Sequence, residues 1–154
     1  MSASIVCGVD GSADAQAALQ VASDLAERLE LRLVVAYVAE PAYIPYAAAA
    51  PFGRMSGHYA VMEEMESQEE HAERLLEEVV TASGLVGAER RVGVGVPAER
   101  LADLADEEDA ELLVVGSRGR GAFRAAFLGS VSNALVGVAR CPVLIVPPGA
   151  TESP

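Results

Sequence analysis

The chain has 154 residues, 51% of them hydrophobic, and its 11 basic and 23 acidic side chains give a formal net charge of −12. This length suits one domain with a sizeable core, and this composition excludes nucleic acid as a favoured partner and argues against disorder. Because no apolar run reaches the roughly 18–20 residues of a membrane span and the N-terminus lacks a signal-peptide pattern, we expect a cytoplasmic protein without membrane contact.

The first predicted strand covers residues 5–9, and apolar residues at helical spacing follow it up to residue 29. Between them lie Asp10, Gly11 and Ser12, of which Ser12 or Asp10 can cap the helix. Asp10 has a second interpretation as a ligand contact, because open α/β sheets bind ligands at the carboxyl ends of their strands. A second strand is predicted over residues 31–38.

Residues 41–60 differ from both neighbouring segments, with three prolines and four of the seven aromatic residues of the chain. Roughly twenty residues without a period are long for a connection, so we expect a mobile loop insertion in preference to a lid or a partner surface. An acidic helix is predicted over residues 62–83. Its apolar face is formed by Met62, Met65, Leu75, Leu76, Val79 and Val80. We interpret its glutamates as a solvated face rather than as catalytic carboxylates.

The remaining predicted elements are a strand over residues 91–96, a helix over 98–108, and strands over 112–115 and 143–146. Gly93 and Gly95 lie inside a predicted strand and lack the third glycine of a dinucleotide fingerprint. Strands that alternate with helices in this way imply a single-domain α/β fold, with a five-stranded parallel sheet and helices on both faces.

A glycine-rich segment follows the strand over residues 112–115, and we refer to residues 116–132 as the glycine loop. Its glycines are spaced as Gly116-x2-Gly119-x9-Gly129, and Ser130 comes next. Gly116 allows a sharp turn off the strand, for which we expect a positive φ, and Gly119 lets backbone N–H groups approach an oxyanion. Gly129 and Ser130 begin a helix, whose first N–H groups favour an anion.

The charge pattern of this region supports an anionic ligand. No acidic residue occurs from residue 112 to residue 150, whereas Arg118, Arg120, Arg124 and Arg140 do. A basic segment in an acidic chain indicates a small anion more than a nucleic acid. The alternative interpretation is that glycine and arginine only make a soluble loop after a strand, without a ligand. The glycine spacing disfavours this alternative.

The chain resembles the universal stress proteins in three places. The glycine pattern ending in Gly129-Ser130 is similar to that of their nucleotide-binding members, as are the start at residues 5–12 and the ending at residues 141–147. The resemblance implies a Rossmann-like, adenine-nucleotide α-hydrolase-like fold with strand order 3-2-1-4-5. It also implies a family domain over residues 1–148, with residues 149–154 as a tail.

The same resemblance implies a ligand and the residues that bind it. The ligand is ATP, with AMP or cyclic AMP as alternatives, together with Mg²⁺ or Mn²⁺. The nucleoside is assigned to Val9, Asp10 and Val38; the ribose and phosphates to Gly116, Ser117, Arg118 and Gly119; and the phosphates to Gly129, Ser130, Val131 and Ser132. A homodimer through Val143–Val146 is also implied, since an edge strand needs cover.

Two alternatives to a nucleotide-responsive signalling module remain open. The first is a slow ATP hydrolase, which the composition disfavours because all eleven basic residues are arginine and the glycine loop holds no histidine. The second is an interaction protein without a ligand. We nominate no catalytic residue and no metal-ligating set. Cys7 and Cys141 are interpreted as structural thiols, because both lie in or beside apolar strands.

Overall fold

The structure, a computed structural model, describes residues 2–41, 54–118 and 128–149. Strands and helices alternate along the described part of the chain. In order they are β1 (Ser4–Gly8), α1 (Ala13–Leu29), β2 (Arg32–Ala39), α2 (Arg54–Ala82), β3 (Glu89–Val94), α3 (Pro97–Glu107), β4 (Ala110–Gly116), α4 (Ser130–Val138) and β5 (Val143–Val146).

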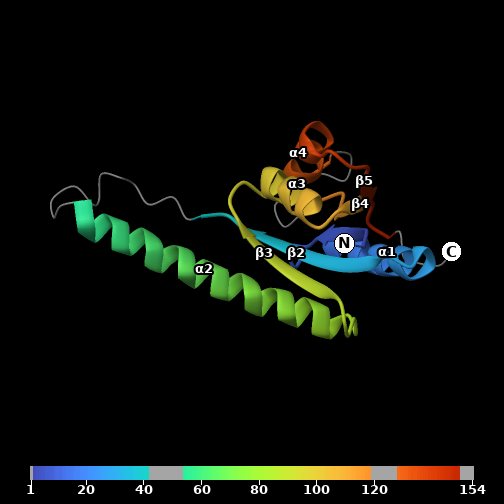
Figure 1. Cartoon of the computed structure of the whole chain (residues 1–154), viewed down its shortest axis with the longest axis horizontal. Helices are drawn as coiled ribbons and strands as arrows, with labels where there is room; N and C mark the ends of the chain where they lie inside the picture. The colour runs from blue at the N-terminus through green and yellow to red at the C-terminus, as the bar shows by residue number, and fades with distance from the viewer. Residues whose placement is uncertain (1, 42–53, 119–127, 150–154) are drawn as a thin grey trace.

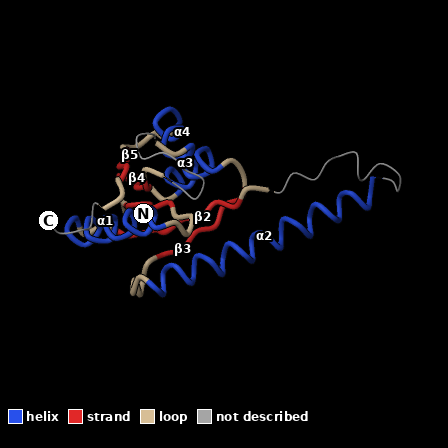
Figure 2. Tube along the Cα trace, turned by 180° about the vertical axis from the view of Figure 1, so that it is seen from behind, coloured by secondary structure: helices blue, strands red, loops and turns tan. Residues whose placement is uncertain are grey.

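The five strands form one parallel sheet in the order β3-β2-β1-β4-β5, which confirms the predicted fold. Helices α3 and α4 lie on one side of the strands and α2 on the other (Figure 1), an arrangement also visible from behind in Figure 2. The contacts place α1 on the same face as α2, where it packs on β1 and β4. The sheet is therefore covered on both faces.

Strand β1 occupies the centre of the sheet and contributes to the core on both faces. Ile5, Val6 and Cys7 are fully buried, with Ile5 and Cys7 in the cluster under α1 and α2 and Val6 in the cluster under α3 and α4. Such a run of consecutive buried residues is typical of a parallel strand covered on both faces. Burial raises the pKa of Cys7 to about 12, so its thiol stays protonated, as suits a structural role.

Helix α2 differs most from the prediction. It begins at Arg54, so residues 54–60 are helical and not part of a loop, while residues 42–53 lie outside the described part of the chain. The predicted apolar face is also too long: Met62 and Met65 are 47% and 43% exposed. The reason is geometric, because α2 extends past the strands that it covers (Figure 1).

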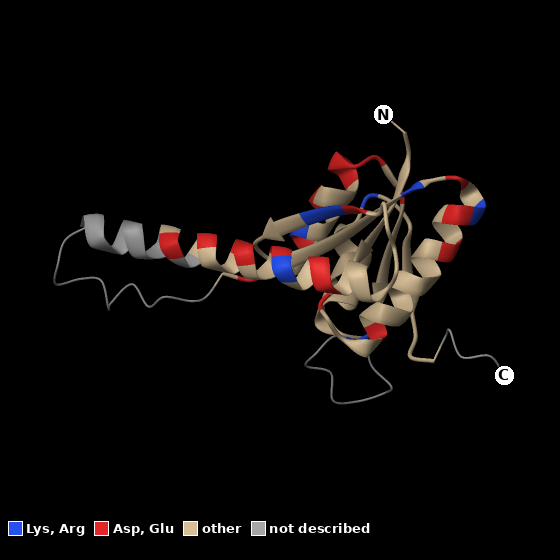
Figure 3. Ribbon diagram, turned by 90° about the horizontal axis from the view of Figure 1, so that it is seen from below, with Lys and Arg blue, Asp and Glu red and all other residues tan. Residues whose placement is uncertain are grey.

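The buried part of α2 is its C-terminal half, which packs on β2 and β3. Ala72, Leu76 and Val80 are buried there. Ala72 was not among the residues predicted for the apolar face. Acidic residues are distributed along the helix (Figure 3), and all seven of those whose exposure is described are exposed. The interpretation of these glutamates as a solvated face is confirmed for them.

A cluster of charged residues lies at the amino edge of the sheet. Arg32, the first residue of β2, pairs with Glu89 at 2.9 Å and with Glu108 at 3.4 Å, and Arg91 pairs with the same two carboxylates. Arg32 also donates to the backbone carbonyl of Glu108, which accepts from the hydroxyl of Ser4 as well. The cluster thus ties the starts of β1, β2 and β3 to the end of α3.

We expect this cluster to make stability depend on pH in the acidic range. The hydrogen bond from Arg32, and then the charges of Arg32 and Arg91, hold the pKa of Glu89 below its usual value. Because the folded pKa is depressed, the stabilisation is present above about pH 4.3 and is lost as the pH falls through the folded pKa. Glu89 is 36% exposed, so the effect is below about 1 kcal/mol.

Urea unfolding between pH 3 and pH 6 measures this dependence. The free energy of unfolding of the parent is expected to fall more steeply below pH 4.3 than that of Glu89→Gln, which cannot lose a charge. Glu77→Gln removes an exposed carboxylate of α2 and serves as the control. Parallel pH profiles for the parent and Glu89→Gln would contradict the prediction.

Candidate functional site

The candidate site lies where β1 and β4 end side by side. Cys7 of β1 is in register with Val114 of β4, so the chain leaves the sheet at Val9–Asp10 on one strand and at Gly116–Ser117 on the next. Strands β2 and β3 lie on one side of β1, and strands β4 and β5 lie on its other side. The carboxyl ends of β1 and β4 therefore form the topological switch point, where open α/β sheets bind ligands.

The turn after β1 holds Asp10 in place through local hydrogen bonds. The Oδ1 atom of Asp10 accepts from the backbone N–H of Ser12 at 2.9 Å, and Gly11 between them has a φ of 81°, which favours glycine. The Oγ atom of Ser12 accepts from Ala15 N at 3.2 Å and so caps α1. Of the two predicted caps, Ser12 is therefore the one that bonds the helix, and Asp10 orders the turn.

Gly116 is required for a different reason from the one predicted. Its φ is not positive, so the expectation of a left-handed turn is wrong. A Cβ atom at this position would instead lie 2.9 Å from both the carbonyl carbon and the carbonyl oxygen of Asp14, in the first turn of α1. Glycine is needed because the end of β4 packs directly against the backbone of α1.

Ser117 connects the end of β4 to the start of α4. Its N–H donates to the carbonyl of Val146 at 2.9 Å, and its own carbonyl accepts from Gly129 N at 2.6 Å. The hydroxyl of Ser132 donates to the carbonyls of Ser117 and Gly129, at 3.0 and 3.1 Å. Ser132 is 2% exposed, so its hydroxyl holds the two ends of the glycine loop together and does not face a ligand.

The N-terminus of α4 presents backbone N–H groups beside this junction. Gly129 is the N-cap residue and has no side chain to satisfy them, and the first helical bond runs from Asn133 N to the Gly129 carbonyl. The N–H groups of Ser130, Val131 and Ser132 precede that bond and have no acceptor within the helix. Together with the helix dipole, they suit a phosphate group.

An ion pair at the site includes an acidic residue, Asp14, that the sequence pattern did not reveal. The guanidinium of Arg118 lies 3.3 Å from the carboxylate of Asp14, and the Ser117 hydroxyl lies 3.5 Å from the same carboxylate oxygen. Of this pair, Arg118 alone was predicted. Asp14 lies in the first turn of α1, and no sequence feature links it to Arg118, 104 residues later. Gly119, Arg120 and Arg124 lie outside the described residues.

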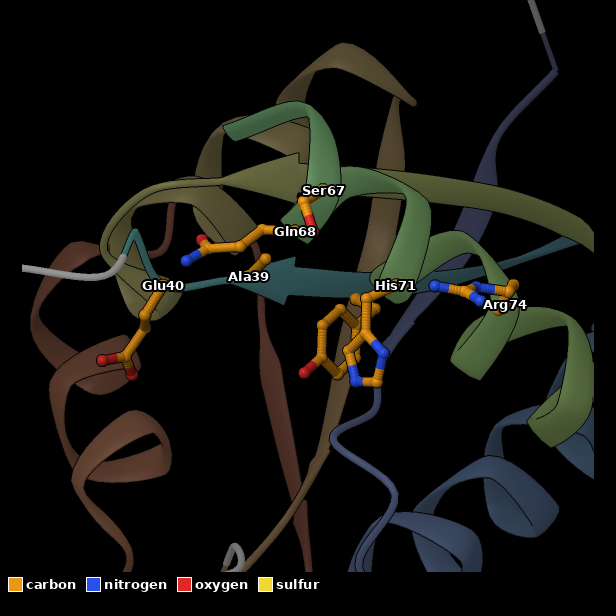
Figure 4. A pocket seen from close by; sticks show the side chains of 7 residues that line it. Ala39, Glu40, Ser67, Gln68, His71 and Arg74 are labelled. Atoms are coloured by element: carbon orange, nitrogen blue, oxygen red, sulfur yellow. The ribbon is translucent and has the colours of Figure 1, made fainter. Parts of the chain in front are cut away.

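Val38 lies further along the same edge of the sheet, at the end of β2. Its half-buried side chain packs with the cluster under α3 and α4. Its neighbours Tyr37 and Ala39 point to the opposite face, where they line a pocket of about 320 Å³ with Glu40 and with Ser67, Gln68, His71 and Arg74 of α2 (Figure 4). This pocket contains none of the predicted site residues.

The described residues, with the gaps at 42–53 and 119–127, contain no group of three or more His, Cys, Asp or Glu side chains that could hold a metal ion. Among the helices of the same described ranges, none is long and apolar enough to cross a membrane.

Comparisons with known proteins agree on one family. The model of the Universal stress protein family matches residues 1–147. A universal stress protein of Thermus aquaticus is 34% identical over 142 residues, covering 92% of this chain and 96% of that protein. A universal stress protein of Mycobacterium tuberculosis is 31% identical over 149 residues, but there the match spans 47% of the relative.

Solved structures share the fold. The universal stress protein UspA from Lactobacillus plantarum superposes with a TM-score of 0.71 at 22% identity, covering 94% of this chain and 97% of the other. A universal stress protein in complex with cAMP superposes with a TM-score of 0.64 at 29% identity, with the same coverage of both chains.

Proposed function

Since this chain belongs to the universal stress protein family, we propose that it binds ATP with Mg²⁺ or Mn²⁺ and acts as a dimeric, nucleotide-responsive module of the cytoplasm. The observation that carries the proposal is the N-terminus of α4, which opens beside the end of β4 with three backbone N–H groups that lack helical acceptors. Such a terminus is a ready-made phosphate site.

The assigned residues follow the edge of the sheet in the order in which a nucleotide would contact them. Val38 ends β2 and Asp10 follows β1, so the nucleoside lies over these two strands. The phosphates lie beyond β4, between Ser117 and the N-terminus of α4. This placement supports Val9, Asp10 and Val38 as nucleoside contacts and Gly116, Ser117, Arg118, Gly129, Ser130, Val131 and Ser132 as the ribose and phosphate contacts. Gly119 lies outside the described residues, and its assignment to the ribose and phosphates rests on the family resemblance alone.

Ser132 binds phosphate in this proposal through its backbone N–H, because its hydroxyl is already bonded within the loop. Ser130 is exposed and its hydroxyl remains available to the ligand or to water of a bound cation. The relative whose structure holds cAMP is 29% identical to this chain, which supports an adenine nucleotide as the ligand class.

Binding and release, rather than rapid hydrolysis, are the activity that this site supports. The described part of the glycine loop contains no histidine or lysine, and the Oδ1 atom of Asp10 is engaged by its own turn. Phosphoryl transfer would depend on positioning and charge alone. We therefore propose slow ATP hydrolysis at most, and that occupancy of the site is what a partner detects.

Thermal unfolding with and without ATP and Mg²⁺ tests the proposal. ATP at about one hundred times its dissociation constant is expected to stabilise the parent by roughly 2.7 kcal/mol. Gly129→Trp is expected to lose this stabilisation, because an indole at the N-cap occupies the space in front of the α4 N–H groups. The φ of −63° at Gly129 is accessible to any residue, so the variant should fold.

Gly137→Trp is the matched control, since a Cβ atom there meets no atom within 4 Å and the residue lies on the same helix. It is expected to respond to ATP as the parent does. If neither ATP, AMP nor cyclic AMP shifts the unfolding of the parent, the proposal fails. The nucleotide-independent interaction protein, favoured by the exposed Met62 and Met65 on α2, would then replace it.

A further inference from the structure

The pair formed by Asp14 and Arg118 places a second carboxylate, besides that of Asp10, next to the arginine of a site that is proposed to bind phosphate. The Nε atom of Arg118 lies 3.3 Å from the Oδ2 atom of Asp14, and the two side chains are 24% and 15% exposed. The pair is thus shielded from solvent on most sides, which keeps the interaction stronger than that of a fully exposed ion pair.

Asp14 cannot easily move away from the glycine loop. The cap by Ser12 fixes the first turn of α1, and the backbone carbonyl of Asp14 is in close contact with Gly116. The Ser117 hydroxyl, 3.5 Å from Oδ2, approaches the carboxylate from the same loop. The carboxylate is therefore a fixed part of the site, while Arg118 has a long side chain that can turn toward a ligand.

This arrangement has an electrostatic consequence for an anionic ligand. In the pair, Asp14 cancels most of the charge that Arg118 would offer to a phosphate. If the guanidinium turns to the phosphate, the carboxylate is left facing a second negative charge. Either way the site favours phosphates less than its arginine and helix N-terminus suggest, unless a cation bound to the ligand compensates for Asp14.

We propose that Asp14 is a specificity-determining residue that makes the site select the cation complex of a nucleoside polyphosphate over the free polyphosphate. This inference rests on the proposed nucleotide site and extends it to an acidic residue outside the predicted set. Asp14 acts on the ligand by charge, opposing free phosphates and tolerating phosphates that carry Mg²⁺. It is not a metal ligand in this scheme.

The competing explanation is that Asp14 serves only the helix. An acidic residue in the first turn interacts favourably with the helix dipole, whatever lies nearby. The two explanations differ in what they predict for ligands. A helix-stabilising residue affects the binding of all ligands equally, whereas a residue that opposes phosphate affects ATP and leaves adenosine alone.

The test measures the affinities of the parent, Asp14→Asn and Asp24→Asn for ATP, adenosine and inorganic tripolyphosphate, each with and without Mg²⁺, by titration calorimetry at low salt. Asp24→Asn removes an exposed carboxylate from the same helix and so controls for the change in net charge. Asp14→Asn preserves the shape of the side chain, and its far-ultraviolet circular dichroism is compared with that of the parent.

Asp14→Asn is expected to bind Mg²⁺-free ATP roughly tenfold more tightly, as fits the removal of one unit charge near the phosphates. Its affinity for adenosine should stay within about twofold of the parent value. The gain in ATP affinity on adding Mg²⁺ should shrink correspondingly, and Asp24→Asn should behave as the parent does.

Three results would each overturn the inference. Both substitutions change the affinity for ATP equally, Asp14→Asn gains as much affinity for adenosine as for ATP, or Asp14→Asn loses affinity for ATP. Failure of the proposed function gives a different result, in which the parent binds no adenine compound. Tripolyphosphate then decides: tighter binding to Asp14→Asn than to the parent and to Asp24→Asn supports the role of Asp14, and no difference overturns it.

Discussion

Replacing Gly116 with valine is expected to lower the free energy of unfolding by about 3 kcal/mol, at the upper end of the cost of overpacking. The new Cβ atom would lie 2.9 Å from the carbonyl carbon and oxygen of Asp14. These are backbone atoms of a capped helix, so they cannot turn aside as the end of a side chain could. Either α1 or the end of β4 must shift, and the site between them must change with it.

Urea unfolding of Gly116→Val and Gly137→Ala measures this cost against a matched change. Gly137 lies in α4, where an added Cβ atom meets no atom within 4 Å, so alanine there should raise stability by about 0.5–1 kcal/mol through helix propensity. Gly116→Val is thus expected to lower the free energy of unfolding, and Gly137→Ala to raise it. A valine at residue 116 that leaves stability and ATP binding intact would show that α1 and β4 do not need this close approach.

Replacing Ile145 with proline is expected to convert the proposed dimer into a monomer. Among the described residues, strand β5 pairs only with β4, through bonds such as Leu113 N to the Pro142 carbonyl and Ser117 N to the Val146 carbonyl. Because bonding directions alternate along a strand, the N–H and C=O groups of Val143 and Ile145 point to the open edge. Proline removes the outward donor and leaves the bonds to β4 in place.

Sedimentation equilibrium checks this expectation. In a two-fold symmetric dimer, each chain carries the substitution, so the interface loses two hydrogen bonds. This loss should raise the dissociation constant of the dimer by roughly one hundredfold. Ile145→Ala removes most of the same half-buried side chain but keeps the donor, and it should remain largely dimeric. A parent that is monomeric at every concentration would end the proposal that this strand forms the interface.

The succession of strands and helices could be predicted from the sequence, because each apolar run or period reports which faces of an element are buried. The buried run from Leu113 to Val115 and the fully buried β1 are of this kind. The predicted boundaries of the strands lie within about two residues of those observed. The strand order rested on the family resemblance, since spacing along a chain does not say which strands become neighbours.

Contacts between distant segments are what the sequence could not supply. Nothing near Gly116 in the sequence says that the backbone of Asp14, about one hundred residues earlier, lies against it. The same limit explains why Asp14 was missed and why the partners of the Ser132 hydroxyl, the carbonyls of Ser117 and Gly129, could not be predicted. For α2 the periodic pattern continues beyond the end of the sheet, so exposed Met62 and Met65 look like core residues.

The central place of β1 also has a consequence for how the chain folds. Its neighbour on one side, β2, is close in the sequence, but its other neighbour, β4, begins at Ala110, so the sheet is completed only after a long loop closes. The half formed by β1, β2 and β3 can pair early, and β4 and β5 can join it only when that loop closes. A nucleotide bound across β1 and β4 would therefore slow unfolding chiefly by holding these two halves together.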